Sequence, residues 1–508
     1  MPTLSPADRA RVIRRAGQTH HVDDLGRTTS HSHERWLAHT AATRGCVRPV
    51  RLTGELHTVD RGTGEILRTR HTATDMPDGV LYVPCGDRRA SVCPPCAETY
   101  RADTYHLIKA GLVGGKGVPD TVCGHPAVFA TLTAPSFGPV HSRSINRRTG
   151  GVRPCRPRRN APVCPHGRLL SCTQRHAENA PCLGRPLCLD CYDHAHHVVW
   201  NGWAGELWRR TTITLTRSLR RLERALGLRL RVSYGKVAEY QRRGVVHFHA
   251  LIRLDLLDPD DRDAILAPPS TITAGHLAEL VAAAVTATGF TTPDYADTGH
   301  NWPITWGTQT DIRIVPGSST AIGTGEITSE AVAAYLAKYA TKATEPAGLP
   351  VTSRMNAAAA ELHSDSRTHI GRLVAYARQL GTRPRDWTTD EQIADWHDTY
   401  GRLERWTHML GFGGHFATKS RRYSTTHTRL RAERRTWRRT ARDDWRQRHH
   451  HGHYVGQDLD DDATLVVYDL TLAGIGWNTT ADAQLAADAA ARAREHRALA
   501  REERTTTP

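Results

Sequence analysis

The chain has 508 residues and a formal net charge of +16 at pH 7, and only six of its 68 basic residues are lysines. This length allows about three domains with substantial cores, and so many guanidinium groups favour a polyanionic partner such as nucleic acid. No apolar run of about eighteen residues occurs, and no apolar segment follows the charged N-terminus, so we expect no membrane partner, no secretory signal and a cytoplasmic location.

The first part of the chain divides into a polar segment and a cysteine-containing module. Residues 1–45 are rich in His and Arg and indicate no role beyond one short helix. In residues 46–126, short strands alternate with turns and lead into a helix at 97–112, which ends close to a Gly-Gly pair. This pattern predicts a zinc-ribbon-like module followed by a helix.

Residues 127–345 predict an α+β domain in which helices flank an antiparallel β-sheet, because β-branched strands alternate with amphipathic helices. The first expected elements are a strand at 127–135, a zinc-binding insertion at about 152–195, a helix at 203–228, and strands at 229–241 and 244–254. A helix at 273–289, a strand at 309–316 and a helix at 328–343 follow.

The remainder of the chain is predicted to be mainly helical and then basic. Residues 346–420 form a helical region, and residues 421–508 form a basic segment and a C-terminal tail. The density of Arg in the basic segment favours contact with phosphates and therefore binding that weakens as salt rises.

Two histidines lie one residue apart in the apolar segment VVHFHALIRL, residues 245–254. Strand side chains alternate between faces, so His247 and His249 point the same way while Phe248 points the other way. A hydrogen-bonded pair of core histidines is the structural alternative. Paired imidazoles on one face are a common route to a divalent metal site, and the segment therefore predicts one.

A third, anionic ligand is predicted from the hairpin that joins the two strands. If Arg242, Arg243 and Gly244 form a three-residue loop with a left-handed glycine, Glu239 faces His247 across the hairpin. A loop of two or four residues would move Glu239 to the opposite face, where it would be an exposed strand carboxylate. The three-residue loop adds Glu239 to the predicted metal site.

The predicted helix at 328–343 carries two tyrosines and two lysines at helical spacing. Tyr335 and Tyr339 are four residues apart, as are Lys338 and Lys342, so each pair shares a face. On their own, the tyrosines are typical of an aromatic stripe that packs against a sheet. Beside a metal-binding strand pair, they also suit a phenolate nucleophile that attacks a phosphodiester polarised by metal and lysine.

In this order, FATLTAPSFGPVH, GVVHFHAL and YLAKYATK resemble the three motifs of HUH endonucleases. Over residues 85–345 the chain closely resembles the replication initiators (RepSA type) of actinobacterial plasmids and integrative conjugative elements. The resemblance implies that His247 and His249, with Glu239, bind a divalent ion, Mg²⁺ or Mn²⁺. The resemblance ranks Tyr339, which follows the motif lysine, as the first candidate nucleophile. Because the chain also has Tyr335 four residues earlier, the resemblance leaves open whether one or two tyrosines react.

The resemblance implies a rolling-circle replication initiator that binds an origin and nicks one DNA strand. The protein would become joined to the 5′ phosphate through tyrosine and leave a 3′-OH for a host polymerase. DNA, single-stranded at the nick site, is the expected partner, and the lack of a GxxxxGK[ST] motif implies a host helicase. A conjugative relaxase or transposase, and a non-catalytic zinc-stapled DNA-binding regulator, are the alternatives.

Eleven cysteines lie mostly in two stretches, which in a reducing compartment indicates zinc. The first stretch, CGDRRASVCPPC, ends in a CxxC knuckle followed by a helix, which is a strong zinc half-site. The predicted ligands are Cys46, Cys85, Cys93 and Cys96, with His57 or His106 as replacements for Cys46.

The insertion offers a second zinc site. Cys188 and Cys191 form a clear knuckle, and two ligands from Cys164, His166 and Cys172 would complete it. Four protein ligands leave no open position, so we expect about two zinc ions, both structural. The remaining candidates in this part of the chain are Cys155, His176 and Cys182, while Cys123 has no evident partner and is expected to be inert.

Overall fold

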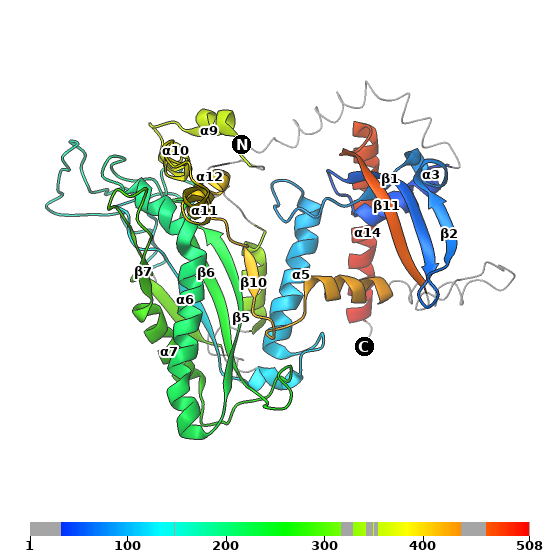
Figure 1. Ribbon diagram of the computed structural model, residues 1–508, viewed down its shortest axis with the longest axis horizontal. Helices are drawn as coiled ribbons and strands as arrows, with labels where there is room; N and C mark the ends of the chain where they lie inside the picture. The colour runs from blue at the N-terminus through cyan, green and yellow to red at the C-terminus, as the bar shows by residue number, and fades with distance from the viewer. Residues whose placement is uncertain are drawn as a thin grey trace. The chain divides into compact units, whose positions relative to one another are not determined.

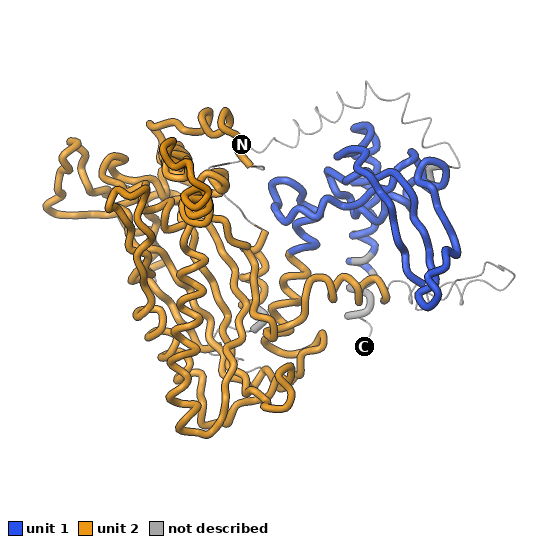
Figure 2. Tube along the Cα trace, viewed as in Figure 1, with its two compact units in different colours: residues 1–100, 437–508 blue, residues 101–436 orange. Residues whose placement is uncertain are grey.

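The structure, a computed structural model, describes residues 32–146, 148–315, 329–341, 349, 354–437 and 464–506, without the side chains at 32–34, 329, 330, 339, 497 and 500–506. The chain forms two compact units, one of residues 1–100 and 437–508 and one of residues 101–436 (Figure 2). The first unit combines the two ends of the chain, whereas the second is continuous in sequence. Residues 46–100 of the predicted cysteine-containing module therefore share a unit with residues 437–508 of the predicted basic segment and tail.

An antiparallel sheet forms the centre of the first unit (Figure 1). Its long strand β1 (Val50–Asp60) pairs along its whole length with β11 (Thr464–Ile475), which comes from the far end of the chain. The other edge of β1 pairs with β2 (Ile66–His71) and β3 (Leu81–Val83). The helices of this unit are α3 (Ser32–Thr40), α4 (Thr72–Asp75) and α14 (Thr480–Thr506).

Aromatic contacts tie the C-terminal part of the first unit to its cysteine-bearing part. The Trp477 ring lies 4.9 Å from the Tyr82 ring and 6.0 Å from the ring of buried Trp36. The Trp477 indole N–H also donates a hydrogen bond to the Cys46 carbonyl at 2.9 Å. Trp477, two residues after β11, thus helps to fix the loop that carries the first cysteine.

The second unit is built on a five-stranded sheet whose neighbouring strands are all antiparallel, in the order β10-β5-β6-β4-β9. The strands are β4 (Ala127–Leu132), β5 (Leu230–Tyr240), β6 (Val246–Leu256), β9 (Thr310–Ile314) and β10 (Ala417–Lys419). This sheet confirms the predicted antiparallel architecture. The short edge strand β10 was not predicted, because three residues carry too little pattern.

Helices α6 (His194–Leu226) and α7 (Ala274–Ala287) cover one face of this sheet, where Phe248 and Ala250 of β6 are fully buried (Figure 1). Helix α6 begins nine residues before the predicted start because the Asp193 carboxylate accepts a hydrogen bond from the His196 N–H and caps the helix. It ends at Gly227, whose φ of 66° suits a left-handed cap.

The other helices lie around this core. Helix α8 (Ser329–Tyr339) packs against β5, and α10 packs against α6. The predicted helical region contains α9 (Ala357–His363), α10 (His369–Gly381), α11 (Asp390–Asp398) and α12 (Gly401–Arg405). Helix α5 spans Pro94–Val113, and the small pair β7 (Gly289–Thr291) and β8 (Pro303–Thr305) precedes β9.

Within the described part of the chain, no helix has the length and apolar character needed to cross a membrane.

Candidate metal centres

The turn between β5 and β6 determines which side chains meet. Gly244 has a φ of 83°, and the Gln241 N–H donates a hydrogen bond to the Val245 carbonyl at 2.9 Å. A three-residue loop with a left-handed glycine therefore closes the hairpin, as predicted. In this register Glu239 lies opposite His247, and loops of two or four residues are excluded.

Glu239, His247 and His249 meet on one face of the hairpin. Glu239 Oε2 lies 3.0 Å from His247 Nε2 and 3.3 Å from His249 Nε2. In an octahedron with ligand distances of about 2.1 Å, neighbouring ligand atoms lie roughly 3 Å apart. The three side chains therefore fit a six-coordinate divalent ion and would leave positions for water and substrate oxygens. His249 is buried and His247 is half-buried, so access is from the His247 side.

Two further side chains orient the imidazoles. Thr131 Oγ1 on β4 lies 3.1 Å from His249 Nδ1, and Gln241 Nε2 lies 3.4 Å from His247 Nδ1. Each ring is held at Nδ1 and directs Nε2 towards Glu239. Burial lowers the pKa of His249 and favours neutral imidazole, the form that binds metal. Sequence analysis missed Thr131 and Gln241, because orienting residues have no characteristic spacing.

Tyr335 is the tyrosine that the structure brings to this group. Its ring lies edge-on to the His249 ring, with 5.1 Å between centroids, and 6.0 Å from Phe129. The Tyr335 side chain is 39% exposed, so solvent reaches it. Lys338, on the same helix, is also exposed.

The remaining helix candidates are less defined. Tyr339 is the last residue of α8, but its side chain lies outside the described residues, as does the whole of Lys342. The first rank given to Tyr339 therefore stays a prediction. The observed neighbour of the histidines is Tyr335, which sequence analysis ranked second.

The other end of the same hairpin holds a second charged group. Arg253 and Asp255 are fully buried and form an ion pair at 2.7 Å, and His125 Nδ1 lies 2.8 Å from the Asp255 carboxylate. The Ser233 hydroxyl donates a hydrogen bond to Asp255 at 2.6 Å. Burial raises the pKa of Asp255, but hydrogen bonds with His125 and Arg253 outweigh it and lower the pKa to about 2. This group is closed to solvent and is structural.

The first cysteine group contains the four predicted ligands. The Sγ atoms of Cys85 and Cys96 lie 3.7 Å apart, as do those of Cys46 and Cys93. In a zinc tetrahedron with Zn–S distances of about 2.3 Å, neighbouring sulfurs lie roughly 3.8 Å apart, so the group fits zinc. Hydrogen bonding with Cys96 lowers the pKa of Cys46 to about 5, which favours a thiolate there. Among described residues, neither alternative histidine belongs to this group.

The second group lies in the insertion. It contains the Cys188 and Cys191 knuckle and two of the three candidate partners, Cys164 and His166. His166 Nδ1 lies 3.2 Å from Cys191 Sγ, 3.7 Å from Cys188 Sγ and 4.0 Å from Cys164 Sγ. A tetrahedral Cys3His site needs sulfur-to-nitrogen spacings of roughly 3.6 Å. Cys172 lies in a different group.

A third group, of His141, Cys155, Cys172 and His176, was not predicted as a site. Its spacings are 3.3 Å from His141 Nδ1 to His176 Nε2, 3.5 Å from Cys172 Sγ to His176 Nε2, and 3.9 Å from Cys155 Sγ to His141 Nδ1. The described residues therefore contain three four-residue Cys/His groups that can hold metal, rather than about two. Cys123 belongs to none of them.

Comparison with known proteins assigns the chain to a family. The family model described as replication initiator protein, pSAM2 (RepSA), matches residues 32–491. A replication initiator protein of Streptomyces ambofaciens is 41% identical over 492 residues, and the alignment covers 95% of each chain. No solved structure matches the chain.

Proposed function

This chain belongs to the RepSA family of replication initiators, and we propose that it starts rolling-circle replication by nicking one DNA strand at an origin. The 5′ phosphate becomes joined to a tyrosine, and a 3′-OH is left for a host polymerase. Reversal of the reaction rejoins the strand. In this proposal the five-stranded sheet is an HUH-type sheet, and Glu239, His247 and His249 are the ligands of its catalytic ion.

The observation that carries the proposal is the contact between Tyr335 and His249. A phenol and three candidate metal ligands lie within one small, partly exposed site, with 5.1 Å between the two rings. A packing stripe alone would leave the tyrosine buried, whereas Tyr335 is 39% exposed. Solvent access is what a nucleophile for DNA requires.

The chemistry follows from these side chains. The phenolic oxygen attacks phosphorus, the new O–P bond forms, and the bond from phosphorus to the 3′ oxygen breaks. The phenol loses its proton, and the leaving 3′ oxygen gains one. A bound Mg²⁺ or Mn²⁺ would polarise the phosphoryl oxygens. Lys338 and Lys342, four residues apart in the sequence, would add positive charge beside the same phosphate.

Partners and structural ions complete the proposal. DNA is the substrate, single-stranded at the nick site, and duplex unwinding and synthesis are left to a host helicase and polymerase. The four cysteines of the first group and Cys164, His166, Cys188 and Cys191 of the second would each hold a structural zinc. The net charge of +16 supports binding to a polyanion.

The decisive experiment seeks a covalent adduct between the full-length protein and single-stranded oligonucleotides that tile its replicon, with Mn²⁺ present. His249→Ala should lower nicking by roughly 10³-fold, because several kcal/mol of charge stabilisation is lost. His397→Ala, which changes an exposed histidine on α11, is the matched control and should nick normally.

The tyrosines are tested in the same assay. Loss of the adduct in Tyr335→Phe alone would make Tyr335 the nucleophile, and loss in Tyr339→Phe alone would favour the resemblance-based ranking. Adduct formation by both single variants but not by the double variant would mean that the two oxygens are interchangeable. An adduct formed by the double variant would overturn the proposed nucleophile.

The zinc assignment has its own test. Cys96→Ser and Cys191→Ser should each lose one zinc ion and should unfold or precipitate, because binding free energy of about 10 kcal/mol or more at such sites is also folding free energy. Zinc is measured by mass spectrometry of the purified protein. Cys123→Ser, outside the groups, should keep the full zinc content.

A further inference from the structure

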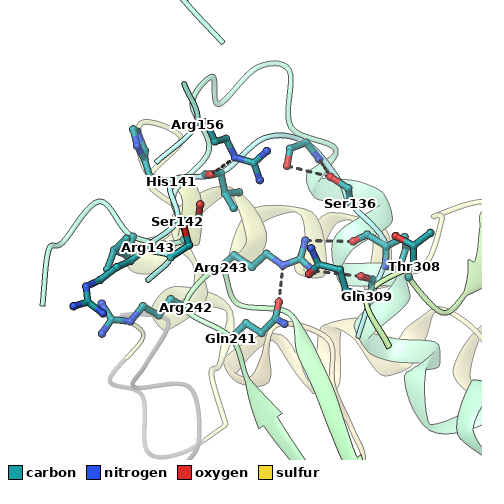
Figure 3. A pocket seen from close by; sticks show the side chains of 18 of the residues that line it. Ser136, His141, Ser142, Arg143, Arg156, Gln241, Arg242, Arg243, Thr308 and Gln309 are labelled. Atoms are coloured by element: carbon teal, nitrogen blue, oxygen red, sulfur yellow. Dashed lines mark hydrogen bonds between the residues drawn. The ribbon is translucent and has the colours of Figure 1, made fainter. Parts of the chain in front are cut away.

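A basic pocket lies at the turn end of the β5–β6 hairpin, with a volume of about 660 Å³ (Figure 3). Two of its arginines, Arg242 and Arg243, come from the hairpin turn, and two, Arg143 and Arg156, come from the long segment between β4 and α6. Among the described residues that line it, the one carboxylate is that of Glu178. The pocket is therefore strongly cationic.

The pocket adjoins the candidate catalytic site through one side chain. Gln241 lines the pocket and accepts a hydrogen bond from Arg243 Nε at 2.8 Å, while its Nε2 lies 3.4 Å from His247 Nδ1. The Arg243 guanidinium is fixed further by the carbonyl of Pro135, at 3.2 Å. The Gln241 side chain therefore links the pocket to the candidate metal ligands.

The third Cys/His group adjoins the pocket through one of its members, His141. His141 lines the pocket, Arg143 follows two residues later, and Arg156 directly follows Cys155. The Ser142 N–H donates a hydrogen bond to Cys155 Sγ at 3.1 Å, and Arg156 Nε donates to the Val140 carbonyl at 2.8 Å. Any ion held by this group would fix the backbone that carries both arginines.

The geometry of the group suits one zinc ion. The spacings given above, 3.3 to 3.9 Å, are those of a Cys2His2 tetrahedron. Cys182 Sγ lies 3.4 Å from His176 Nδ1, on the side of the ring away from the other ligands, where it can accept the Nδ1–H. That contact would leave the lone pair of His176 Nε2 directed at the ion, the usual arrangement for a metal-bound imidazole.

We propose that His141, Cys155, Cys172 and His176 hold a zinc ion that braces an arginine pocket, and that this pocket binds phosphates of single-stranded DNA beside the nick site. The inference rests on the proposed function for the position of the nick. Guanidinium groups fork onto phosphate oxygens, and the hydroxyl and amide groups of Ser136, Ser142 and Gln309 add further donors.

One detail of the pocket arginines favours an anionic ligand over a purely structural cluster. Arg143 Nε is buried and has no hydrogen-bond partner among the described residues, and Arg242 is exposed at the turn. Buried donors are usually paired, so an unpaired one at a pocket wall suits an acceptor that is not part of the chain.

The first test measures binding of the full-length protein to a fluorescein-labelled single-stranded oligonucleotide of mixed sequence, across a salt series and without added divalent ions. Arg143→Ala/Arg242→Ala should weaken binding by roughly tenfold or more, since charge-assisted bonds are lost. The slope of log affinity against log salt should fall by about 1.4, for two phosphates at about 0.7 each.

The matched control removes the same charge elsewhere. Arg220→Ala/Arg221→Ala changes two exposed arginines on α6 and should leave the salt slope nearly unchanged. An unchanged slope in the pocket variant, or an equal fall in the control, would overturn the DNA-binding role. Because the assay measures binding and needs no cleavage, its result can be interpreted even if the nicking proposal fails.

The second test concerns the metal. Cys155→Ser should lower the zinc content by one ion and weaken DNA binding as much as the arginine variant, while His141→Cys, which keeps a ligand, should retain both. Full zinc content in Cys155→Ser would overturn the metal site. If Cys155→Ser does not fold, His141→Ala provides the same measurements of zinc content and DNA affinity. Loss of zinc with unchanged DNA affinity would overturn the proposal that the ion braces the pocket.

Discussion

The two ends of the β5–β6 hairpin carry the same kinds of side chain and treat them differently. At the turn end, one carboxylate, Glu239, faces two imidazoles, and one of these is partly exposed. At the other end, the carboxylate of Asp255 is fully buried and bonded to Arg253, His125 and Ser233. The first set keeps a side open for a ligand, and the second has its charges neutralised within the protein.

The difference shows that residue type alone does not distinguish a group open to a ligand from a closed, structural one. Burial and the pairing of charges make the distinction, because a buried charge is tolerated only when it is paired. Substitutions at the closed end should therefore reduce stability, and substitutions at the turn end should reduce metal binding or reaction rate.

The largest effect is expected from Asp255→Asn. The change leaves the Arg253 guanidinium buried without its counter-ion, and removing one partner of a buried pair costs about 3–5 kcal/mol. Urea unfolding of the second unit would show the loss. Glu239→Gln should change the free energy of unfolding by less than about 1 kcal/mol, and an equal loss in both variants would break the comparison.

Lys236, between the two ends on the opposite face, provides an intermediate case. Its Nζ lies 3.7 Å from the centroid of the Phe248 ring, and burial lowers its pKa to about 7 from an ordinary 10.5. Lys236→Met should raise the free energy of unfolding at pH 7 by about 1–4 kcal/mol, because a buried charge is replaced by an apolar group.

The gain from Lys236→Met should shrink as pH rises from 7 towards 10. In that window the unfolded chain binds more protons than the native chain, so the stability of the unchanged protein increases with pH. Chemical unfolding at several pH values measures this. Lys116→Met, at an exposed ion pair with Glu433, is the control and should show no such trend. A pH-independent gain would show that Lys236 is not titrating.

Glu239→Gln should weaken metal affinity by roughly tenfold to a hundredfold, because the anionic ligand becomes a neutral amide. Isothermal titration of the protein with Mn²⁺, with zinc retained, gives the constant. Glu361→Gln on α9 serves as control. Identical titration curves for the Glu239 variant and the unchanged protein would remove Glu239 from the site.

The smallest effect is expected from Thr131→Val, which keeps the shape of the side chain but removes the hydroxyl near His249 Nδ1. Loss of an orienting partner should lower metal affinity by about tenfold, with no change in fold. The same titration detects it. A loss as large as that of His249→Ala would mean that Thr131 acts directly rather than by orienting the ring.

Local turn chemistry made the turn end of the hairpin predictable. Gly244 needs a left-handed backbone, which defined the loop length and hence the register that sets Glu239 opposite His247. The CxxC knuckle likewise indicated the first cysteine group. In both cases the decisive residues lie close together in sequence.

The parts that were missed depend on contacts between distant residues. His141 and His176 approach within 3.3 Å although no knuckle joins them, so no spacing rule indicated the third group. The pairing of β1 with β11 had no local signal for the same reason. Tyr335 is four residues from Tyr339 in the sequence, and only tertiary packing shows that the Tyr335 ring lies beside His249.

The pairing of β1 with β11 also sets an order of events during synthesis. A ribosome adds roughly 5–20 residues per second, so β1 is made roughly 20–80 s before its partner strand. The second unit, which is continuous in sequence, can complete its sheet in that interval, while one edge of β1 still lacks its partner. The five-stranded sheet in the middle of the sequence can therefore form on a nascent chain before the sheet of the first unit is closed.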